Sequence, residues 1–386
     1  MAAMIQGPRL MSIGGGAVKE AASVLERLNV KRPLIVSDAF MRDSGLLSRL
    51  TDALDQGRIK WDLFADTVPD PTTAVVEVGV GRLRSSAYDS LIAFGGGSPM
   101  DTAKAMSVQA AMGGAMREHK VPKQADKSAV PVICIPTTAG TGSEVTRFCV
   151  ITDTETDEKM LIAGLGCLPA AAIVDYELTM GMPFRLTADT GIDSLTHAIE
   201  AYVSKRHNPY ADSFALAAMR RIAKYIRQAC FEPDNPAARE EMMLGATQAG
   251  MAFSNSSVCL VHGMSRPIGA FFHVPHGLSN AMLLPAITAF SAEAALERYA
   301  DCARSMGVAG AEEGNQGAVA RLLEALQRLN ADLKVPTPKA YGIEAQRYQS
   351  LLETMASQAL ASGSPGNNPR VPSAAEIVDL YKQVYA

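Results

Sequence analysis

The chain has 386 residues, 48% of them hydrophobic and 20% charged, which is enough apolar material for a large core and predicts two domains. Its 36 basic and 40 acidic side chains give a net charge of −4, which argues against a nucleic-acid-binding protein. No apolar run reaches 18 residues and the start lacks a signal-peptide pattern, so we expect neither a membrane span nor secretion. The six cysteines form no CxxC motif, which argues against a disulfide framework and indicates a reducing cytoplasm.

The first half of the chain predicts strands that alternate with helices. Short apolar runs typical of buried strands lie at residues 32–38, 90–94, 130–135 and 171–175. Helical patterns lie before and between them, at residues 17–28 and 73–85. This alternation predicts an α/β domain with a mainly parallel sheet covered by helices on both faces.

From about residue 183 the sequence changes to helical periodicity. Amphipathic patterns rich in Ala, Leu and Arg are clear at residues 213–226, 314–330 and 374–385. We therefore place the domain boundary near residues 180–183 and predict domains of residues 1–181 and 182–386. Residues 361–370 are rich in Gly, Ser, Pro and Asn, so we expect a surface loop there.

Three glycines, residues 95–97, follow the predicted strand at 90–94 and precede a helical pattern. Glycine lets the backbone bend and approach a ligand without a Cβ clash. Ser98 is expected as the N-cap of the helix, with Asp101 placed as in a capping box. A helix N-terminus that follows a turn without side chains can bind a phosphate group through its backbone N–H groups. The alternative is a tight, well-capped turn that binds nothing.

A second segment of this kind, residues 135–146, runs from a strand into hydroxyls and glycines (IPTTAGTGSEVT). Two such turns at strand ends favour a nucleotide-binding crevice, although each alone is also typical of a polar loop. Asp38 ends an earlier strand, where a carboxylate can accept hydrogen bonds from ribose hydroxyls. The same carboxylate would repel a 2′-phosphate, so Asp38 favours NAD over NADP; an ordinary surface aspartate is the alternative.

Histidines in the second half indicate a metal site. Asp193 and His197 are four residues apart in a helical pattern, so they share a face about 6 Å apart. His262, His273 and His276 lie in apolar, glycine-punctuated segments. One Asp and three His suit Fe(II) or Zn(II), although each histidine alone is more often structural. For the fourth ligand we choose His276 and place His273 beside the ligands. The other histidines have polar neighbours and are expected on the surface: His119 and His207.

In these motifs the sequence resembles the iron-containing (group III) alcohol dehydrogenases, which include lactaldehyde reductases, butanol dehydrogenases and propanediol dehydrogenases. The matching segments occur in family order over most of the chain: GGGSPMDTAK, PTTAGTGSEVT, TGIDSLTHAIEAYVS, GMAFSNSSVCLVHGMS, GAFFHVPHG and NNPR. The resemblance implies a Rossmann-like, dinucleotide-binding domain at residues 1–181. It also implies an all-helical, metal-binding domain at residues 182–386, with the active site in the cleft between them.

The resemblance also implies roles for individual residues. The metal ligands would be Asp193, His197, His262 and His276. The pyrophosphate would lie against Gly96, Gly97 and Ser98. The rest of the cofactor site would be lined by Asp38, Thr137, Thr138, Thr141, Thr146, Phe148, Lys159 and Leu178. Asp70 falls where many relatives carry Asn, which puts its cofactor contact in doubt.

Arg266 departs from the family pattern, because many alcohol-oxidising relatives carry a histidine there that helps to move the proton. Arginine stays charged and cannot serve as a general base at neutral pH. It can bind a carboxylate, phosphonate or sulfonate through two hydrogen bonds. The alternative is that Arg266 contacts the cofactor or a neighbouring carboxylate.

The function predicted from these features is a metal-dependent, NAD-linked alcohol dehydrogenase or aldehyde reductase for a small primary alcohol. Fe(II), or Zn(II), would act as a Lewis acid on the substrate oxygen while hydride passes between the alcohol carbon and nicotinamide. Bound water, a ribose hydroxyl or His273 would relay the proton. The alternative substrate is a short anionic alcohol, such as a 4-hydroxybutyrate-like acid, held by Arg266. Less favoured alternatives are a lyase of the dehydroquinate synthase type and a non-catalytic sensor.

The predicted partner is a small alcohol or aldehyde, with no role for nucleic acid or membrane. The resemblance implies a homodimer or larger homo-oligomer, and we expect it in the cytoplasm.

Overall fold

The computed structural model describes residues 3–156 and 158–386, which divide into two compact units. One unit is Gln6–Gly181, and the other is Met182–Ala386 together with the described residues up to Ile5. The division falls in the segment where the composition of the sequence changes. Among the described residues, no helix has the length and apolar character that crossing a bilayer requires.

A parallel six-stranded sheet forms the centre of the first unit, in the order β1-β8-β5-β4-β2-β3. Its strands are β1 (Leu10–Ile13), β2 (Pro33–Asp38), β3 (Asp62–Thr67), β4 (Ser90–Gly95), β5 (Val132–Pro136) and β8 (Ala171–Val174). The four predicted strands are the four inner ones, which are buried along almost their whole length. The edge strands β1 and β3 were not predicted, because partial exposure gives them mixed sequences without a continuous apolar run.

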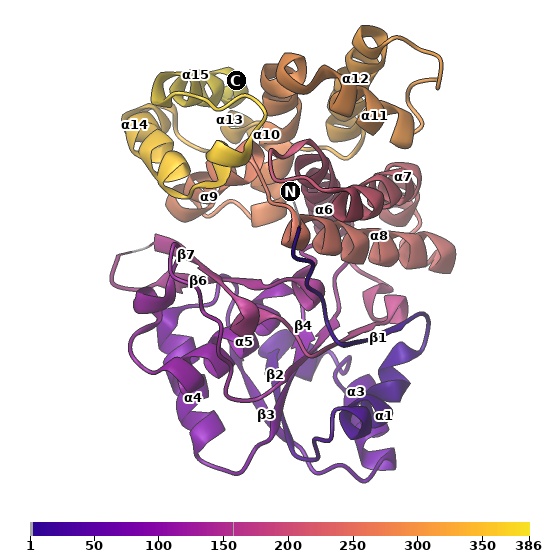
Figure 1. The fold of residues 1–386 in the computed structure, drawn as a ribbon, viewed down its shortest axis with the longest axis vertical. Helices are drawn as coiled ribbons and strands as arrows, with labels where there is room; N and C mark the ends of the chain where they lie inside the picture. Colours follow the sequence, from indigo (N-terminus) through magenta and orange to yellow (C-terminus); the bar gives the residue numbers. More distant parts are fainter. Residues whose placement is uncertain (1–2, 157) are drawn as a thin grey trace. The chain divides into compact units, whose positions relative to one another are not determined.

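Helices cover both faces of this sheet (Figure 1). Helices α4 (Thr73–Arg84) and α5 (Gly97–Met112) share one apolar core with the sheet, and α1 (Ala21–Arg27) and α3 (Ser48–Gln56) share the other. Leu34 lies in the first core and its neighbour Ile35 in the second, because successive side chains of a strand point to opposite faces. The α/β class is therefore confirmed.

A buried lysine and a partly buried aspartate of α5 organise the polar loops of this unit. Lys104, which is fully buried, donates from Nζ to oxygen atoms of Ser143, Thr146 and Phe148 over 2.6–3.3 Å. Asp101 accepts from Ser143 Oγ at 2.7 Å and from the N–H of Val150 at 2.9 Å. These bonds tie the 137–146 loop, and a hairpin that the sequence did not predict, to the helix. The hairpin strands are β6 (Phe148–Asp153) and β7 (Glu158–Ala163).

The predicted capping box at the start of α5 was wrong. The helix begins at Gly97, its N-cap is Gly96, and no side chain caps it. Asp101 lies two residues beyond the third helical position, where a capping-box residue would be, and its carboxylate accepts hydrogen bonds from Ser143 and Val150 instead. No side chain therefore caps the backbone N–H groups in the first turn of α5.

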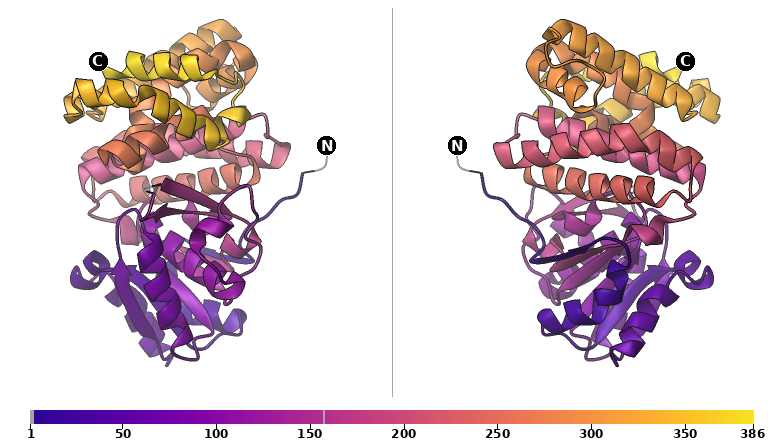
Figure 2. Two further views of the ribbon diagram at one scale, coloured as in Figure 1. Left: turned by 90° about the vertical axis from the view of Figure 1, so that its left-hand side faces the viewer. Right: turned by 90° about the vertical axis from the view of Figure 1, so that its right-hand side faces the viewer.

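The second unit is helical throughout its described residues (Figure 2). Its helices are α6 (Phe184–Val203), α7 (Pro209–Phe231), α8 (Pro236–Asn255), α9 (Leu260–Phe272), α10 (His276–Ser291), α11 (Leu296–Ser305), α12 (Asn315–Asp332), α13 (Pro338–Tyr341), α14 (Ala345–Ala361) and α15 (Ala374–Tyr385). Helices α6, α7 and α8 pack on one another, and α10 packs on both α6 and α9. The three helical patterns predicted from the sequence are all present.

One stretch expected on the surface is only partly there, and one histidine expected there is buried. Residues 361–370 are mostly exposed or half-buried, and they include a short 3₁₀ turn (Ser364–Asn367). Within this stretch Asn368 is 1% exposed, and Pro365 lies so close to Gly263 of α9 that a Cβ on that glycine would come within 2.8 Å of the proline ring. His119 is 2% exposed, with its ring Nε2 2.7 Å from a backbone carbonyl. In both cases a polar side chain forms a hydrogen bond with a backbone carbonyl. Composition alone does not tell such a buried polar residue from one that is exposed to solvent.

Replacing Lys104 with Met should destabilise the α/β unit by about 3 kcal/mol, because the change leaves buried oxygens without a donor and Asp101 without its cation. The midpoint of urea unfolding measures the loss. The exposed Lys31→Met is the matched control and should unfold as the wild type does. An unchanged midpoint for Lys104→Met would show that these bonds contribute no net stability.

Candidate metal centre and dinucleotide site

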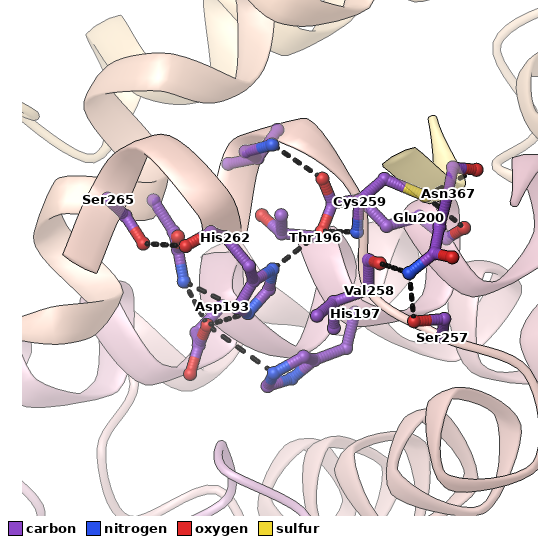
Figure 3. A network of polar contacts seen from close by, with 12 residues as sticks. Asp193, Thr196, His197, Glu200, Ser257, Val258, Cys259, His262, Ser265 and Asn367 are labelled. Atoms are coloured by element: carbon purple, nitrogen blue, oxygen red, sulfur yellow. Dashed lines mark hydrogen bonds and ion pairs between the residues drawn. The ribbon is translucent and has the colours of Figure 1, made fainter. Parts of the chain in front are cut away.

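Three helices bring one carboxylate and three imidazoles together. Asp193 and His197 lie one turn apart on α6, with 3.9 Å between Asp193 Oδ1 and His197 Nε2. His262 of α9 and His276 of α10 place their Nε2 atoms 3.5 Å and 3.8 Å from the same oxygen. The four ligand atoms all lie within 4.8 Å of one another. Figure 3 shows Asp193, His197 and His262 turned toward a common point.

This arrangement fits a divalent metal ion in both chemistry and electrostatics. One carboxylate oxygen and three imidazole nitrogens form a donor set that suits iron or zinc. Burial opposes the charge on Asp193, yet the surrounding imidazoles hold the pKa of its carboxyl below the usual range. The ring of His197 stacks on Phe253 and on His262, with centroids 4.3 Å and 4.5 Å apart. Only His276 is appreciably exposed, with 41% of its side chain accessible, so one edge of the cluster is open.

Glu200, which the sequence reasoning missed, orients His262. It lies on α6 and accepts the Nδ1–H of His262 at 2.6 Å, so Nε2 is left facing Asp193 (Figure 3). It also accepts the backbone N–H groups of Cys259 at 2.9 Å and Val261 at 2.6 Å, at the start of α9. Burial works against a charged imidazole, but Glu200 and Asp193 together raise the pKa of His262 to about 9. Its spacing of three residues after His197, on the same helix face, was the available signal.

Asn280 is a second residue that was missed. Its side chain is fully buried, and Nδ2 lies 2.7 Å from Asp193 Oδ1 and 3.2 Å from Nε2 of both His262 and His276. It lies one helical turn after His276, which was the available signal.

Close packing of α10 on α6 brings His276 to the cluster. Gly277 is the second residue of α10, and a Cβ built on it would lie 2.4 Å from the carbonyl oxygen of Asp189 and 3.3 Å from Asp193 Cβ. Only glycine permits this approach of the two backbones. The close packing of α10 on α6 therefore explains why a glycine follows His276 in the sequence.

The two residues predicted to be catalytic, Arg266 and His273, lie at different places on α9. His273 is the exposed C-cap of the helix, in a left-handed conformation with φ 54°, and is not among the four clustered ligands. Arg266 lies one turn after His262 and is partly buried. Burial lowers the pKa of its guanidinium, and Glu200 opposes that shift. Within residues 3–156 and 158–386, Arg266 forms neither a hydrogen bond nor an ion pair.

The residues predicted to hold the dinucleotide pyrophosphate lie at the C-terminal edge of the sheet. The glycine turn joins β4 to α5, and the N–H of Thr137 donates to the carbonyl of Gly95 at 2.9 Å. A Cβ on Gly97 would come 3.0 Å from Thr141 Cγ2. The glycine turn (residues 95–97) and the loop of residues 137–146, which we call the threonine loop, therefore lie against each other. The uncapped N-terminus of α5 and this bare turn fit a phosphate group.

The other residues predicted to line the cofactor site differ in their position and exposure. Asp38 ends β2 beside β4, partly exposed, and accepts the N–H of Met41 at 2.9 Å. Asp70 is exposed and forms an ion pair with Lys159 at 2.8 Å. Leu178 is 2% exposed and belongs to the apolar core. The remaining ones belong to the threonine loop or to the start of the hairpin: Thr137, Thr138, Thr141, Thr146 and Phe148.

Comparisons with known proteins agree with this geometry. A family model described as iron-containing alcohol dehydrogenase matches residues 8–176, and the C-terminal model of the Fe-containing alcohol dehydrogenase family matches residues 187–385. The chain belongs to the iron-containing alcohol dehydrogenase family. It is 37% identical to lactaldehyde reductase of Escherichia coli (strain K12) over 374 residues, which cover 95% of this chain and 96% of that protein.

Two solved structures of iron-containing alcohol dehydrogenase relatives share the complete fold. A 1,3-propanediol oxidoreductase matches with a TM-score of 0.94 and 33% identity over 100% of both chains. A sulfoacetaldehyde reductase from Bifidobacterium kashiwanohense, solved in complex with NAD+, matches with a TM-score of 0.89 and 28% identity over 100% of this chain and 99% of that chain. These findings confirm the predicted fold and the predicted class of enzyme.

Replacing His262 with Ala should abolish metal binding, because it removes one of four ligands and leaves Glu200 buried without its imidazole. NAD binding should persist, since the glycine turn belongs to the other unit. Metal content after dialysis and NAD titration calorimetry measure the two effects. His273→Ala is the control and should retain metal. One equivalent of tightly bound metal in His262→Ala would contradict the ligand assignment.

Replacing Gly277 with Ala should weaken metal binding at least about tenfold, because the new methyl group would push α10 away from α6. Gly310→Ala provides the control, since nothing lies within 4 Å of its Cβ position. Metal affinity and thermal unfolding of both variants measure the effect. Equal affinities would mean that the backbone approach at Gly277 does not position His276.

Proposed function

We propose that this enzyme is an NAD-dependent dehydrogenase of small primary alcohols that also reduces the matching aldehydes. The observation that carries the proposal is the convergence of Asp193, His197, His262 and His276 from three helices, in a chain that also holds a bare glycine turn before α5. A divalent ion held there, Fe(II) or Zn(II), supplies Lewis acidity toward the substrate oxygen.

The protein residues divide the remaining work. Glu200 keeps the Nε2 atom of His262 turned to the cluster. His273, an exposed imidazole at the end of α9, is assigned to proton exchange with solvent. Asp38, the glycine turn (residues 95–97) and the threonine loop (residues 137–146) would hold NAD, which would supply the hydride acceptor or donor. The NAD+ complex of the related sulfoacetaldehyde reductase supports this choice of cofactor.

Anaerobic NADH absorbance, with metal-stripped protein reloaded with Fe(II) or Zn(II), tests this proposal. Small alcohols and aldehydes should be turned over only when metal is present, because the apo cluster cannot polarise the substrate. The metal-stripped protein without reloading is the control. NAD binding without turnover on any substrate and either metal would refute the dehydrogenase function.

Asp38 should determine the preference for NAD. Replacing Asp38 with Ala removes the carboxylate that repels a 2′-phosphate, so the ratio of kcat/KM for NADP to that for NAD should rise about tenfold or more. Asp43→Ala on the same short helix α2 (Ala39–Asp43) is the matched charge-removing control. An unchanged ratio would place the adenosine ribose away from Asp38.

Arg266 favours a second candidate substrate, a short alcohol or aldehyde that carries a carboxylate or sulfonate. Its guanidinium is partly buried one turn from a proposed metal ligand and has no protein acid paired with it among the described residues. A substrate anion would supply that pair. The relative named sulfoacetaldehyde reductase supports this candidate, since sulfoacetaldehyde carries a sulfonate.

Comparing 1,3-propanediol with 4-hydroxybutyrate and sulfoacetaldehyde decides between the two substrate classes. If Arg266 binds the anion, Arg266→Ala should lower the ratio of kcat/KM for anionic to neutral substrates about tenfold or more. The exposed Arg347→Ala serves as the control for general loss of positive charge. A ratio that does not change would exclude the anionic class.

We further propose a homo-oligomer, a dimer or larger, in the cytoplasm. The six cysteines are all free and buried, which suits a reducing compartment.

A further inference from the structure

One buried amide lies within hydrogen-bond distance of three of the four proposed metal ligands. Asn280 Nδ2 lies 2.7 Å from Asp193 Oδ1 and 3.2 Å from the Nε2 atoms of His262 and His276. It therefore links α10 to α6 and α9 at the ligand atoms themselves. Other asparagines of this unit behave differently: Asn330 donates to a backbone carbonyl, and Asn368 donates to Ser291 and to a backbone carbonyl.

The hydrogen bonds of Asn280 are not those of a structural asparagine. An amide NH₂ has two hydrogens, so it cannot serve three acceptors at once. Its Oδ1 is buried and has no hydrogen-bond partner among the described residues. A buried carbonyl without a partner lowers stability, so the contacts with the ligand atoms explain the position of this side chain, and its own hydrogen bonding does not.

We propose that Asn280 is a positioning residue of the metal centre that holds the Asp193 carboxylate for the ion. This inference rests on the proposed metal role of the cluster. Each imidazole Nε2 has one lone pair, so its contact with Asn280 and its bond to an ion exclude each other. A carboxylate oxygen has more than one acceptor site, so the bond from Asn280 to Asp193 is compatible with a bound ion.

Of the three contacts of the amide, only the bond to Asp193 is compatible with a bound ion. That bond holds the carboxylate in place for the ion, so loss of the amide should lower the affinity for metal. Groups that orient metal ligands typically change affinity 10- to 100-fold when they are removed.

The test is the affinity of the full-length protein for Co(II), measured by competition with a chromophoric chelator, together with the Co(II) absorption spectrum. Asn280→Ala and the better-filling Asn280→Leu should each bind Co(II) about 10- to 100-fold more weakly and show an altered spectrum. NAD affinity should stay at the wild-type value. Asn368→Ala removes an equally buried amide that contacts no ligand, and it should bind Co(II) as the wild type does.

The outcomes separate this inference from the proposed function. If His262→Ala abolishes Co(II) binding while both Asn280 variants bind normally, the inference about Asn280 is wrong and the metal centre stands. If His262→Ala binds Co(II) like the wild type, the metal centre itself is wrong. If the Asn280 variants lose thermal stability without losing Co(II) affinity, Asn280 has only a structural role and the inference is overturned.

Discussion

The proposed metal centre of the helical unit is arranged around one carboxylate oxygen, Oδ1 of Asp193. Imidazoles from three helices and the amide of Asn280 all approach it within 4 Å. This approach requires α10 to pack against α6 with no side chain between their backbones, and Gly277 makes that possible. Because Asp193 is almost fully buried, its charge is tolerable only beside groups that stabilise it.

Buried charge organises both units in the same way. In the helical unit, Glu200 bonds to His262 and to two backbone N–H groups at the start of α9, so one carboxylate sets both a side chain and a helix end. In the α/β unit, Lys104 draws the oxygens of the threonine loop and of the hairpin onto α5. Such groups are costly to bury without partners, so their partners become fixed points of the structure.

Two polar side chains beside the cluster, Arg266 and Asn280, lack part of the pairing that buried groups normally have. Among residues 3–156 and 158–386, Arg266 forms no ion pair and the side-chain carbonyl of Asn280 has no hydrogen-bond partner. The amide group of Asn280 also lies near three acceptors but has only two hydrogens. Both lie on the helices that carry proposed ligands, α9 and α10. Incompletely paired buried groups lower the stability of a fold, and the rest of the structure must offset that cost. Such groups are typical of places where a bound ligand completes the pairing.

The sequence by itself determined the parallel α/β fold of the first unit, the helices of the second, and the chemistry of the cluster. These features leave local traces: apolar runs at the inner strands, helical periodicity, and histidines at ligand spacing. Only the tertiary structure showed that β1 and β3, whose sequences are mixed, form the edge strands of the sheet. It also showed that Asp101 bonds to Ser143 and Val150 and that Asn368 is buried. It also decided that Glu200 and Asn280 join the site. The helical spacing of each residue from a ligand was visible in the sequence. Several of their contacts, however, join residues 59 to 87 positions apart, and a single sequence carries no record of such pairings.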